Sequence, residues 1–310
     1  MSGATLGGSD LEVSRLCLGG NVFGWTANEQ ESFAVLDAFT EGGGTFIDTA
    51  DVYSVWVDGN RGGESEEILG RWMASRGNRD SVVLATKVAK HPDLRGLSPA
   101  NVRTALEGSL TRLGTDVIDL YYAHEDDEAT PLEETLGVFD ELVREGKVRA
   151  LGASNFSAAR LAESLAVSER DGLASYVAVQ PPYNLVQRDE YEGELAGVVT
   201  GHGLSCVPYS GLASGFLTGK YRPGTSVDSP RAGTAGKYLD DRGTALLGVL
   251  DDVAGAHGTS VAAVSLAWLV AQAGVTSAIA SARTPEQLAE LLPVDALQLT
   301  DEEVARLDAA

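Results

Sequence analysis

The chain has 310 residues, of which 44% are hydrophobic and 22% are charged, with only 10 prolines. This composition is typical of an ordinary globular protein and excludes a low-complexity chain. The 23 basic and 45 acidic residues give a net charge of −22 that no basic cluster interrupts, so we expect binding neither to nucleic acid nor to an anionic membrane.

The cysteines and the N-terminal segment bear on where the protein works. Cys17 and Cys206 lie inside apolar runs without CxxC spacing, which favours small buried hydrophobes over a disulfide or a zinc site. The opening segment lacks the charged and apolar blocks of a signal peptide. No apolar run approaches the ~20 residues needed to span a membrane. We therefore expect a cytoplasmic protein without a metal site.

Short apolar segments alternate with amphipathic ones along the whole chain. The apolar segments predict eight strands: Arg15–Leu18, Thr45–Ile47, Val82–Thr86, Val117–Tyr122, Val148–Ala153, Val177–Gln180, Leu204–Pro208 and Thr276–Ala280. The amphipathic segments predict helices at Glu31–Glu41, Ser65–Ser75, Pro99–Leu113, Pro131–Arg144, Ala158–Ser168, Gly243–Ala256 and Val261–Gln272, the last two sharing the seventh crossover.

Capping signals support several of these helices. Ser98-Pro99 places a cap before a proline at the first helical position. The segment Thr284–Gln287 fits a capping box, and Thr300–Glu303 repeats that pattern near the C-terminus. The second box predicts a final helix outside the repeat.

Eight strand–helix units with near-continuous apolar strands indicate parallel strands that are buried on both faces. Their number favours a closed (β/α)8 TIM barrel, with a doubly wound sheet as the alternative. Because barrels of ~250 residues form one domain, we expect residues 1–310 to be a single domain. The longest irregular stretch, Arg222–Asp240, is rich in Gly, Pro, Ser and charge, and loops of this length often act as lids.

Polar residues follow three consecutive predicted strands. Asp48 comes after the second strand, Lys87 after the third and His124 after the fourth, and Tyr53 lies in the loop after the second. In a βα barrel the active site lies at the C-terminal ends of the strands. We therefore expect a carboxylate, an amine, an imidazole and a phenol at one rim.

Each of these groups has a plausible chemical role. A tyrosine titrates near ~10 in water, so Tyr53 needs a stabilised anion to act in proton transfer near neutrality, and Lys87 would lower its pKa. Asp48 would keep Lys87 charged, and His124 would orient a substrate carbonyl. Taken singly, the aspartate also fits a turn cap, the lysine a solvated rim charge and the histidine a surface loop. Their convergence on one rim favours the catalytic interpretation.

Several separated motifs carry a family resemblance. The segments Thr45–Tyr53, Ala85–Lys87, Asp119–His124, Gly146–Phe156 and Val179–Asn184 resemble signatures of the aldo-keto reductase family, in the family's order. The resemblance covers nearly the whole chain. It implies a (β/α)8 barrel, an extended nicotinamide cofactor and reversible carbonyl reduction.

The resemblance also implies roles for the four rim residues. Tyr53 would be the general acid, assisted by Lys87 and Asp48, and His124 would orient the substrate. All four positions are intact. The stretch Gly19–Gly24 is not a GxGxxG motif, and this family needs none.

Cofactor contacts carry over position by position. Ser154, Asn155 and Gln180 match residues that hold the nicotinamide amide, and Tyr209 matches an aromatic residue that stacks on the nicotinamide ring. The segment Ser210–Lys220 resembles a loop that covers the pyrophosphate. Its expected contact residues are Ser210, Leu212, Ser214 and Lys220.

The adenosine end of the cofactor maps to the segment after the eighth strand. Arg283 would pair with the 2′-phosphate of NADP, and Gln287 and Glu290 would face the adenine. The chain departs from the family pattern at Ser281, where glycine is frequent, and at Leu291, where asparagine often contacts adenine. We expect NADPH, with NADH as the alternative.

The substrate, a small carbonyl compound, is expected among the loops after the first, second, fourth and sixth strands. Trp25, Trp56, Glu125 and Tyr183 are the exposed candidates for its pocket. The tryptophans favour an apolar or aromatic carbonyl, and Glu125 would disfavour a strongly anionic one.

Two other functions are open on the sequence. One is an NADPH-binding, redox-sensing regulatory subunit with slow turnover. The other is a Schiff-base lyase with Lys87 as nucleophile, but that chemistry needs a neutral lysine, and Asp48 opposes it.

Overall fold

The computed structural model describes residues 3–310, so the first two residues of the expected domain lie outside the described range. Eight parallel strands form one sheet in the order β10-β3-β4-β5-β6-β7-β8-β9. Their bounds are β3 Leu16–Gly19, β4 Phe46–Asp48, β5 Val83–Val88, β6 Ile118–Ala123, β7 Val148–Ser154, β8 Tyr176–Gln180, β9 Ser205–Cys206 and β10 Ala278–Ala280.

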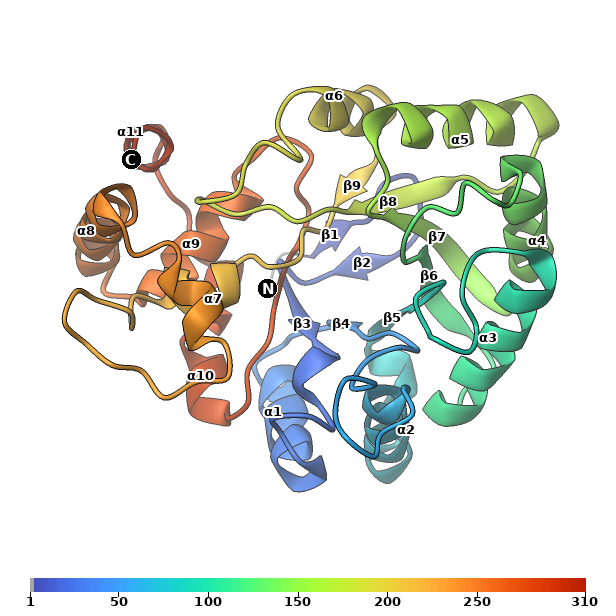
Figure 1. Ribbon diagram of the computed structural model, residues 1–310, viewed down its shortest axis with the longest axis horizontal. Helices are drawn as coiled ribbons and strands as arrows, with labels where there is room; N and C mark the ends of the chain where they lie inside the picture. Colours follow the sequence, from blue (N-terminus) through green and yellow to red (C-terminus); the bar gives the residue numbers. More distant parts are fainter. Residues whose placement is uncertain (1–2) are drawn as a thin grey trace.

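The two ends of this sheet are joined, so the sheet closes on itself. Thr276 N donates to Cys206 O at 2.9 Å, and Ile279 N donates to Pro208 O at 3.0 Å. Helices surround the strands on the outside (Figure 1). The predicted (β/α)8 barrel is therefore confirmed, and the doubly wound alternative is wrong.

The helices alternate with the strands along the chain. Their bounds are α1 Glu29–Glu41, α2 Glu64–Arg76, α3 Pro99–Leu113, α4 Leu132–Arg144, α5 Ala158–Asp171, α6 Glu194–Gly201, α7 Ala232–Gly236, α8 Asp241–His257, α9 Val261–Val270, α10 Pro285–Ala289 and α11 Asp301–Asp308. No single helix within residues 3–310 is long and apolar enough to cross a membrane. Taken together, α8 and α9 have the length and composition of a membrane span, but the two helices are bent by 95° relative to each other.

Side chains fill the interior of the barrel. Strand alternation sends Tyr122 inward and its neighbour Tyr121 outward towards the helices, because successive side chains point to opposite faces. Opposite Tyr122 the next strand has Gly152, where a Cβ atom would lie 2.3 Å from the tyrosine ring. Both cysteines are buried and free, as expected.

A short hairpin precedes the barrel and was not predicted. Strand β1, Ala4–Thr5, pairs with β2, Glu12–Val13, in antiparallel fashion. Its residues Leu6, Leu11 and Val13 belong to the apolar cluster of the barrel interior, so the hairpin covers one end of the barrel. Two residues per strand give too short an alternation for the sequence pattern to show.

Of the three predicted caps, one is confirmed in full, one in part and one not at all. Thr300 and Glu303 form the expected capping box of α11. Thr284 accepts from Gln287 N, but the Gln287 side chain accepts from Arg283 N and does not complete a box. Ser98 precedes α3 without a side-chain cap bond.

Candidate active site

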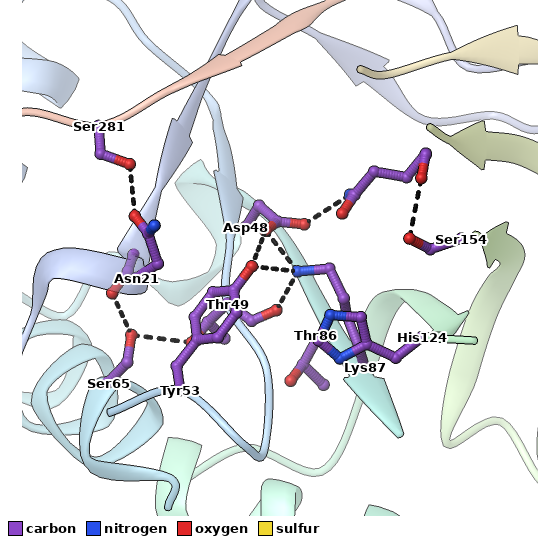
Figure 2. A network of polar contacts seen from close by, with 12 residues as sticks. Asn21, Asp48, Thr49, Tyr53, Ser65, Thr86, Lys87, His124, Ser154 and Ser281 are labelled. Atoms are coloured by element: carbon purple, nitrogen blue, oxygen red, sulfur yellow. Dashed lines mark hydrogen bonds and ion pairs between the residues drawn. The ribbon is translucent and has the colours of Figure 1, made fainter. Parts of the chain in front are cut away.

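The four rim residues meet in one cluster. Lys87 Nζ lies 2.5 Å from Asp48 Oδ1 and 2.8 Å from Tyr53 Oη, and it also donates to Thr49 O at 2.8 Å. Tyr53 Oη donates to the same Asp48 oxygen at 3.2 Å. The His124 ring faces that of Tyr53 with centroids 6.2 Å apart (Figure 2). The structure thus brings together the residues that the sequence singled out.

Lys87 and Asp48 are fully buried, whereas Tyr53 and His124 are partly exposed. The buried ion pair therefore forms the floor of the site and the phenol and imidazole line its opening. Tyr53 is the only residue of the four that both touches the lysine and reaches the opening.

A second set of polar side chains continues from this cluster. Gln180 Nε2 donates to Asp48 Oδ2 at 2.9 Å, and Ser154 Oγ donates to the carbonyl of Gln180 at 2.8 Å. Asn155 donates to His124 O at 2.8 Å and to Ser154 Oγ at 3.0 Å, and Tyr209 Oη donates to Asn155 Oδ1 at 2.8 Å. These are the residues predicted to hold the nicotinamide, and they are joined to the rim cluster in one network.

The backbone is strained around this rim. All non-glycine residues with positive φ within residues 3–310 lie in the segments that connect a barrel strand to the next helix, Ala213 and Ser214 at the start of a 3-10 helix: Ser54, Ala89, Asn155, Ser210, Ala213 and Ser214. Such conformations cost free energy and gather at functional sites. Buried Ser54, directly after Tyr53, is held by a 2.8 Å bond from its hydroxyl to Phe23 O.

Burial controls the protonation of Tyr53. It raises the pKa of the phenol well above its usual value, and the Asp48 carboxylate adds to this effect. The net pKa is thus set by burial and by Asp48, and the lowering effect expected of Lys87 stays a prediction. Tyr53 consequently keeps its proton throughout the neutral range.

Burial also controls His124. It lowers the pKa of the imidazole well below the usual 6.5, and the charges of Lys87 and Lys90 act in the same direction. The ring is therefore neutral near pH 7. Its Nδ1 atom is buried without a partner within residues 3–310. A neutral ring has one donor and one acceptor nitrogen, so one nitrogen can donate to a carbonyl oxygen.

The aromatic residues predicted for the substrate pocket form a wall beside Tyr53. The Trp25 and Trp56 rings meet edge to face with centroids 5.6 Å apart, and Trp56 lies 6.2 Å from the Tyr53 ring. Trp56 is 48% exposed. Glu125 lies 3.8 Å from Lys90, which balances its charge and weakens the predicted bias against anionic substrates.

Tyr183 does not belong to this wall, which corrects a prediction. It is 1% exposed and packs against Tyr191 and Trp268, and its hydroxyl donates to Glu192. The residue is a core aromatic because its strand continues into a bridged segment beside Tyr209.

The expected pyrophosphate and adenosine residues lie on the neighbouring loops. Lys220 is exposed at the end of the segment Ser210–Lys220, in which Leu212 is partly buried. Arg283 and Gln287 are partly buried, and Glu290 is exposed. Leu291, by contrast, is 3% exposed and packs in the core, so it is not available to an adenine ring.

The structure adds two contacts that sequence reasoning missed. The Arg231 guanidinium lies over the Trp25 ring, 5.4 Å from its centroid, and brings the segment Arg222–Asp240 onto the aromatic wall. Ser281 Oγ donates to Asn21 Oδ1 at 2.6 Å and ties the loop after the eighth barrel strand to that after the first (Figure 2). No sequence motif marks Arg231. The unusual serine at position 281 was the available signal for the other contact.

Comparison with known proteins agrees with this geometry. The family model described as "Aldo/keto reductase family" matches residues 15–310. The chain belongs to the aldo/keto reductase family. As a member it is an NAD(P)H-dependent oxidoreductase that acts on carbonyl groups.

Three relatives illustrate the range of this family. An uncharacterised oxidoreductase of Bacillus subtilis is 36% identical, covering 97% of this chain and 93% of its own length. A probable voltage-gated potassium channel subunit beta of Oryza sativa subsp. japonica is 34% identical, covering 98% and 94%. A norsolorinic acid reductase of Emericella nidulans is 32% identical, covering 96% and 78%.

The residues around the rim fit a nicotinamide cofactor. Gln180, Asn155 and Ser154 offer amide and hydroxyl groups next to the rim cluster, and Tyr209 offers a ring beside them. Lys220 and Arg283 form no ion pair within residues 3–310, although most arginines of this acidic reductase do. Unpaired cations suit an anionic ligand.

Proposed function

We propose that the protein reduces aldehydes or ketones to alcohols with hydride from NADPH, and that Tyr53 donates the proton. The observation that carries this proposal is the position of Tyr53 Oη, 2.8 Å from Lys87 Nζ and 3.2 Å from Asp48 Oδ1 at the open end of the site. Bound NADPH supplies the hydride. The protein supplies the proton, the orientation of the carbonyl and the balance of charge.

Each of the four rim residues has a separate role, which follows from its charge. Tyr53 carries its proton at neutral pH, so it can donate that proton to the alkoxide that forms on the carbonyl oxygen. The tyrosinate left behind lies next to the Lys87 ammonium, which stabilises it. Asp48 balances the lysine charge in the resting site, and neutral His124 donates a hydrogen bond to the carbonyl.

Unpaired cations support NADPH over NADH. Arg231 forms no ion pair within residues 3–310, and burial followed by the charge of Arg283 lowers its pKa. Two neighbouring guanidinium groups without a carboxylate are stabilised by a bound anion. A 2′-phosphate with the pyrophosphate provides more negative charge than the pyrophosphate alone. We expect a lower KM for NADPH than for NADH, and Arg283→Gln to reduce the difference.

The test is turnover of a nitrobenzaldehyde, followed by the loss of NADPH absorbance in wild type and Tyr53→Phe. We expect Tyr53→Phe to lower kcat by ~10²–10⁴-fold while NADPH still binds. The matched control is Tyr176→Phe, which removes a buried hydroxyl that has no partner within the described chain. Equal activity in Tyr53→Phe and wild type would refute the proton donor.

A second function is favoured by relatives named as potassium channel subunits. In that case the protein would bind NADPH and turn over slowly as a redox-sensing subunit. Tight quenching of NADPH fluorescence without turnover of any tested aldehyde by wild type would support this function. Rapid turnover would favour the reductase.

A further inference from the structure

A second polar cluster lies on the helix side of the strands that carry the catalytic residues. We call it the rear cluster, and it consists of Asp51, Glu66, Thr86, Arg112 and Tyr121. Each strand or loop member is close in sequence to a catalytic residue. Asp51 is two residues before Tyr53, Thr86 directly precedes Lys87, and Tyr121 is three residues before His124.

Glu66 and Arg112 form the satisfied half of the rear cluster. Glu66 is fully buried and accepts from Arg112 Nε at 2.7 Å and from Thr86 Oγ1 at 2.6 Å. The guanidinium is fixed by close packing against Gly63, where a Cβ atom would come within 2.4 Å of Arg112 Nε. The positive charge of this arginine is therefore already paired.

Asp51 forms the unsatisfied half. Its side chain is 1% exposed, and neither carboxyl oxygen accepts a hydrogen bond of good geometry within residues 3–310. The Tyr121 hydroxyl, buried nearby, also lacks a partner in this range. An ionised carboxylate without partners is costly in the protein interior. A neutral carboxyl group avoids that cost.

The surroundings of Asp51 agree with a neutral carboxyl. Burial is the largest effect and the negative charge of Glu66 is the next, and together they raise the pKa of Asp51 to about 8. Arg112 from α3, Lys87 from β5 and the backbone N–H of Val52 act in the opposite direction without prevailing. Tyr121, which faces Asp51 from β6, has its own pKa raised by burial and keeps its proton.

We propose that Asp51 is a positioning residue whose neutral carboxyl lets the Ala50–Ser54 turn pack against the rear cluster, so that its ionisation displaces Tyr53 and switches the enzyme off in mildly alkaline solution. The proposal rests on the function proposed above for Tyr53. Next to Asp51 the backbone of the turn is loosely bonded, whereas Ser54 at its far end is anchored to Phe23 O. Asp51 N donates to Lys87 O at only 3.4 Å, and Tyr53 N donates to Ala50 O at 3.1 Å. A charge on Asp51 would repel Glu66 and draw water into the rear cluster.

Activity as a function of pH gives the first test. In wild type we expect kcat/KM to fall by about tenfold per pH unit above pH ~8, as for one essential protonated group. Ionisation of Tyr53 does not explain this alkaline fall in kcat/KM, which we call the alkaline limb, because the pKa of Tyr53 lies well above 10. Asp51→Asn, which mimics the protonated acid, should remove the limb. Glu66→Gln should move it to lower pH, because Arg112 is then free to pair with Asp51.

The matched control is Asp295→Asn. Asp295 is 6% exposed, has one unpartnered oxygen in the described chain, and has a pKa raised by burial. It accepts from Arg15 N just before β3, at the end of the barrel away from the catalytic rim. Asp295→Asn should leave the alkaline limb in place. A limb that persists unchanged in Asp51→Asn would overturn the proposal.

A second measurement does not depend on catalysis or on the folding of a variant. Infrared spectra of wild type in heavy water should show the carbonyl band of a protonated carboxyl group at neutral pH, which disappears reversibly near pH ~8. The band should be missing in Asp51→Asn and retained in Asp295→Asn. If no protonated carboxyl is lost over this range, the proposal is refuted. If the band behaves as expected in a protein without reductase activity, only the proposed function fails.

Discussion

Lys87 is the residue that joins the two halves of the proposed chemistry. It is fully buried and bonds to Asp48, Tyr53 and the carbonyl of Thr49. We expect Lys87→Met to lower kcat by ~10²–10⁴-fold, because the tyrosinate that forms in the reaction loses its neighbouring cation. Single-turnover measurement of NADPH oxidation after rapid mixing with the aldehyde would show the loss in the chemical step.

Lys87→Met also leaves Asp48 buried without its cation, so folding must be checked separately. Near-UV circular dichroism and NADPH fluorescence provide that check. Lys147→Met is a suitable control because it removes a lysine from exposed pairs with Glu107 and Glu145. A Lys87→Met variant that folds, binds NADPH and turns over within twofold of wild type would contradict the assigned role.

His124 should stay neutral well below the pH at which an ordinary histidine ionises. Burial lowers its pKa below 6.5 in the native protein. The unfolded chain therefore takes up a proton there as the pH falls through ~6.5 while the native chain does not, and the free energy of unfolding decreases. Imidazole NMR signals, with His124 assigned from His124→Gln, should show no titration of this ring at pH ~6. A titration at the ordinary value would contradict the prediction.

The residue-scale predictions from sequence were good where position on a strand decides the outcome. Asp48, Lys87 and His124 share a rim because they end consecutive parallel strands. The direction of the net pKa shift of Tyr53 could not be predicted, because the burial of the phenol and its closeness to Asp48 depend on packing. Neither the unpartnered state of Asp51 nor the stacking of Arg231 on Trp25 could be predicted, since both depend on segments distant in sequence.

Among the elements, the segment Arg222–Asp240 is tied to the barrel at its first residue. Arg222 makes two bonds to Asp251 of α8, at 2.8 and 2.7 Å, and donates to Gly219 O at 2.7 Å. An exposed ion pair contributes up to about 1 kcal/mol, which corresponds to about fivefold in a rate or equilibrium constant. We expect Arg222→Gln to speed NADPH dissociation by about that factor, as measured by stopped-flow fluorescence.

The control for this prediction lies on the same helix. Arg306→Gln breaks an exposed pair with Asp252, the next residue along α8, without touching the segment Arg222–Asp240. Its NADPH dissociation rate should equal that of wild type. Equal rates for both variants would show that the anchor at Arg222 does not hold the segment over the cofactor.

The ends of the helices and strands were predicted with different accuracy from the hydrophobic pattern of the sequence. The long amphipathic helices, such as Pro99–Leu113, were predicted to within a few residues because their periodicity extends over several turns. The strands β4 and β5 continue through Asp48 and Lys87. Their C-terminal ends were predicted one and two residues too early, because charged residues interrupt an apolar run. Helices α6 and α7 were missed, since eight and five residues carry little periodicity.

At the scale of the whole molecule, the two ends of the chain are joined through the barrel. Strand β10 pairs with β3 in parallel, so residues near the C-terminus complete the sheet begun near the N-terminus. The loops at the rim are joined across that closure, because Ser281 after β10 bonds to Asn21 after β3. We propose that the chain is one domain in which the site and the barrel are stable only together.

One unfolding transition should therefore describe the entire protein. Calorimetry should give a single peak, and far-UV and near-UV circular dichroism should change at the same temperature. NADPH at about 100 times its Kd should add ~2.7 kcal/mol to the free energy of unfolding and move that single transition upward as a unit. Two transitions, of which NADPH shifts only one, would show that part of the barrel unfolds independently of the site. Such a result would contradict both the single domain and the coupling of closure to the catalytic rim.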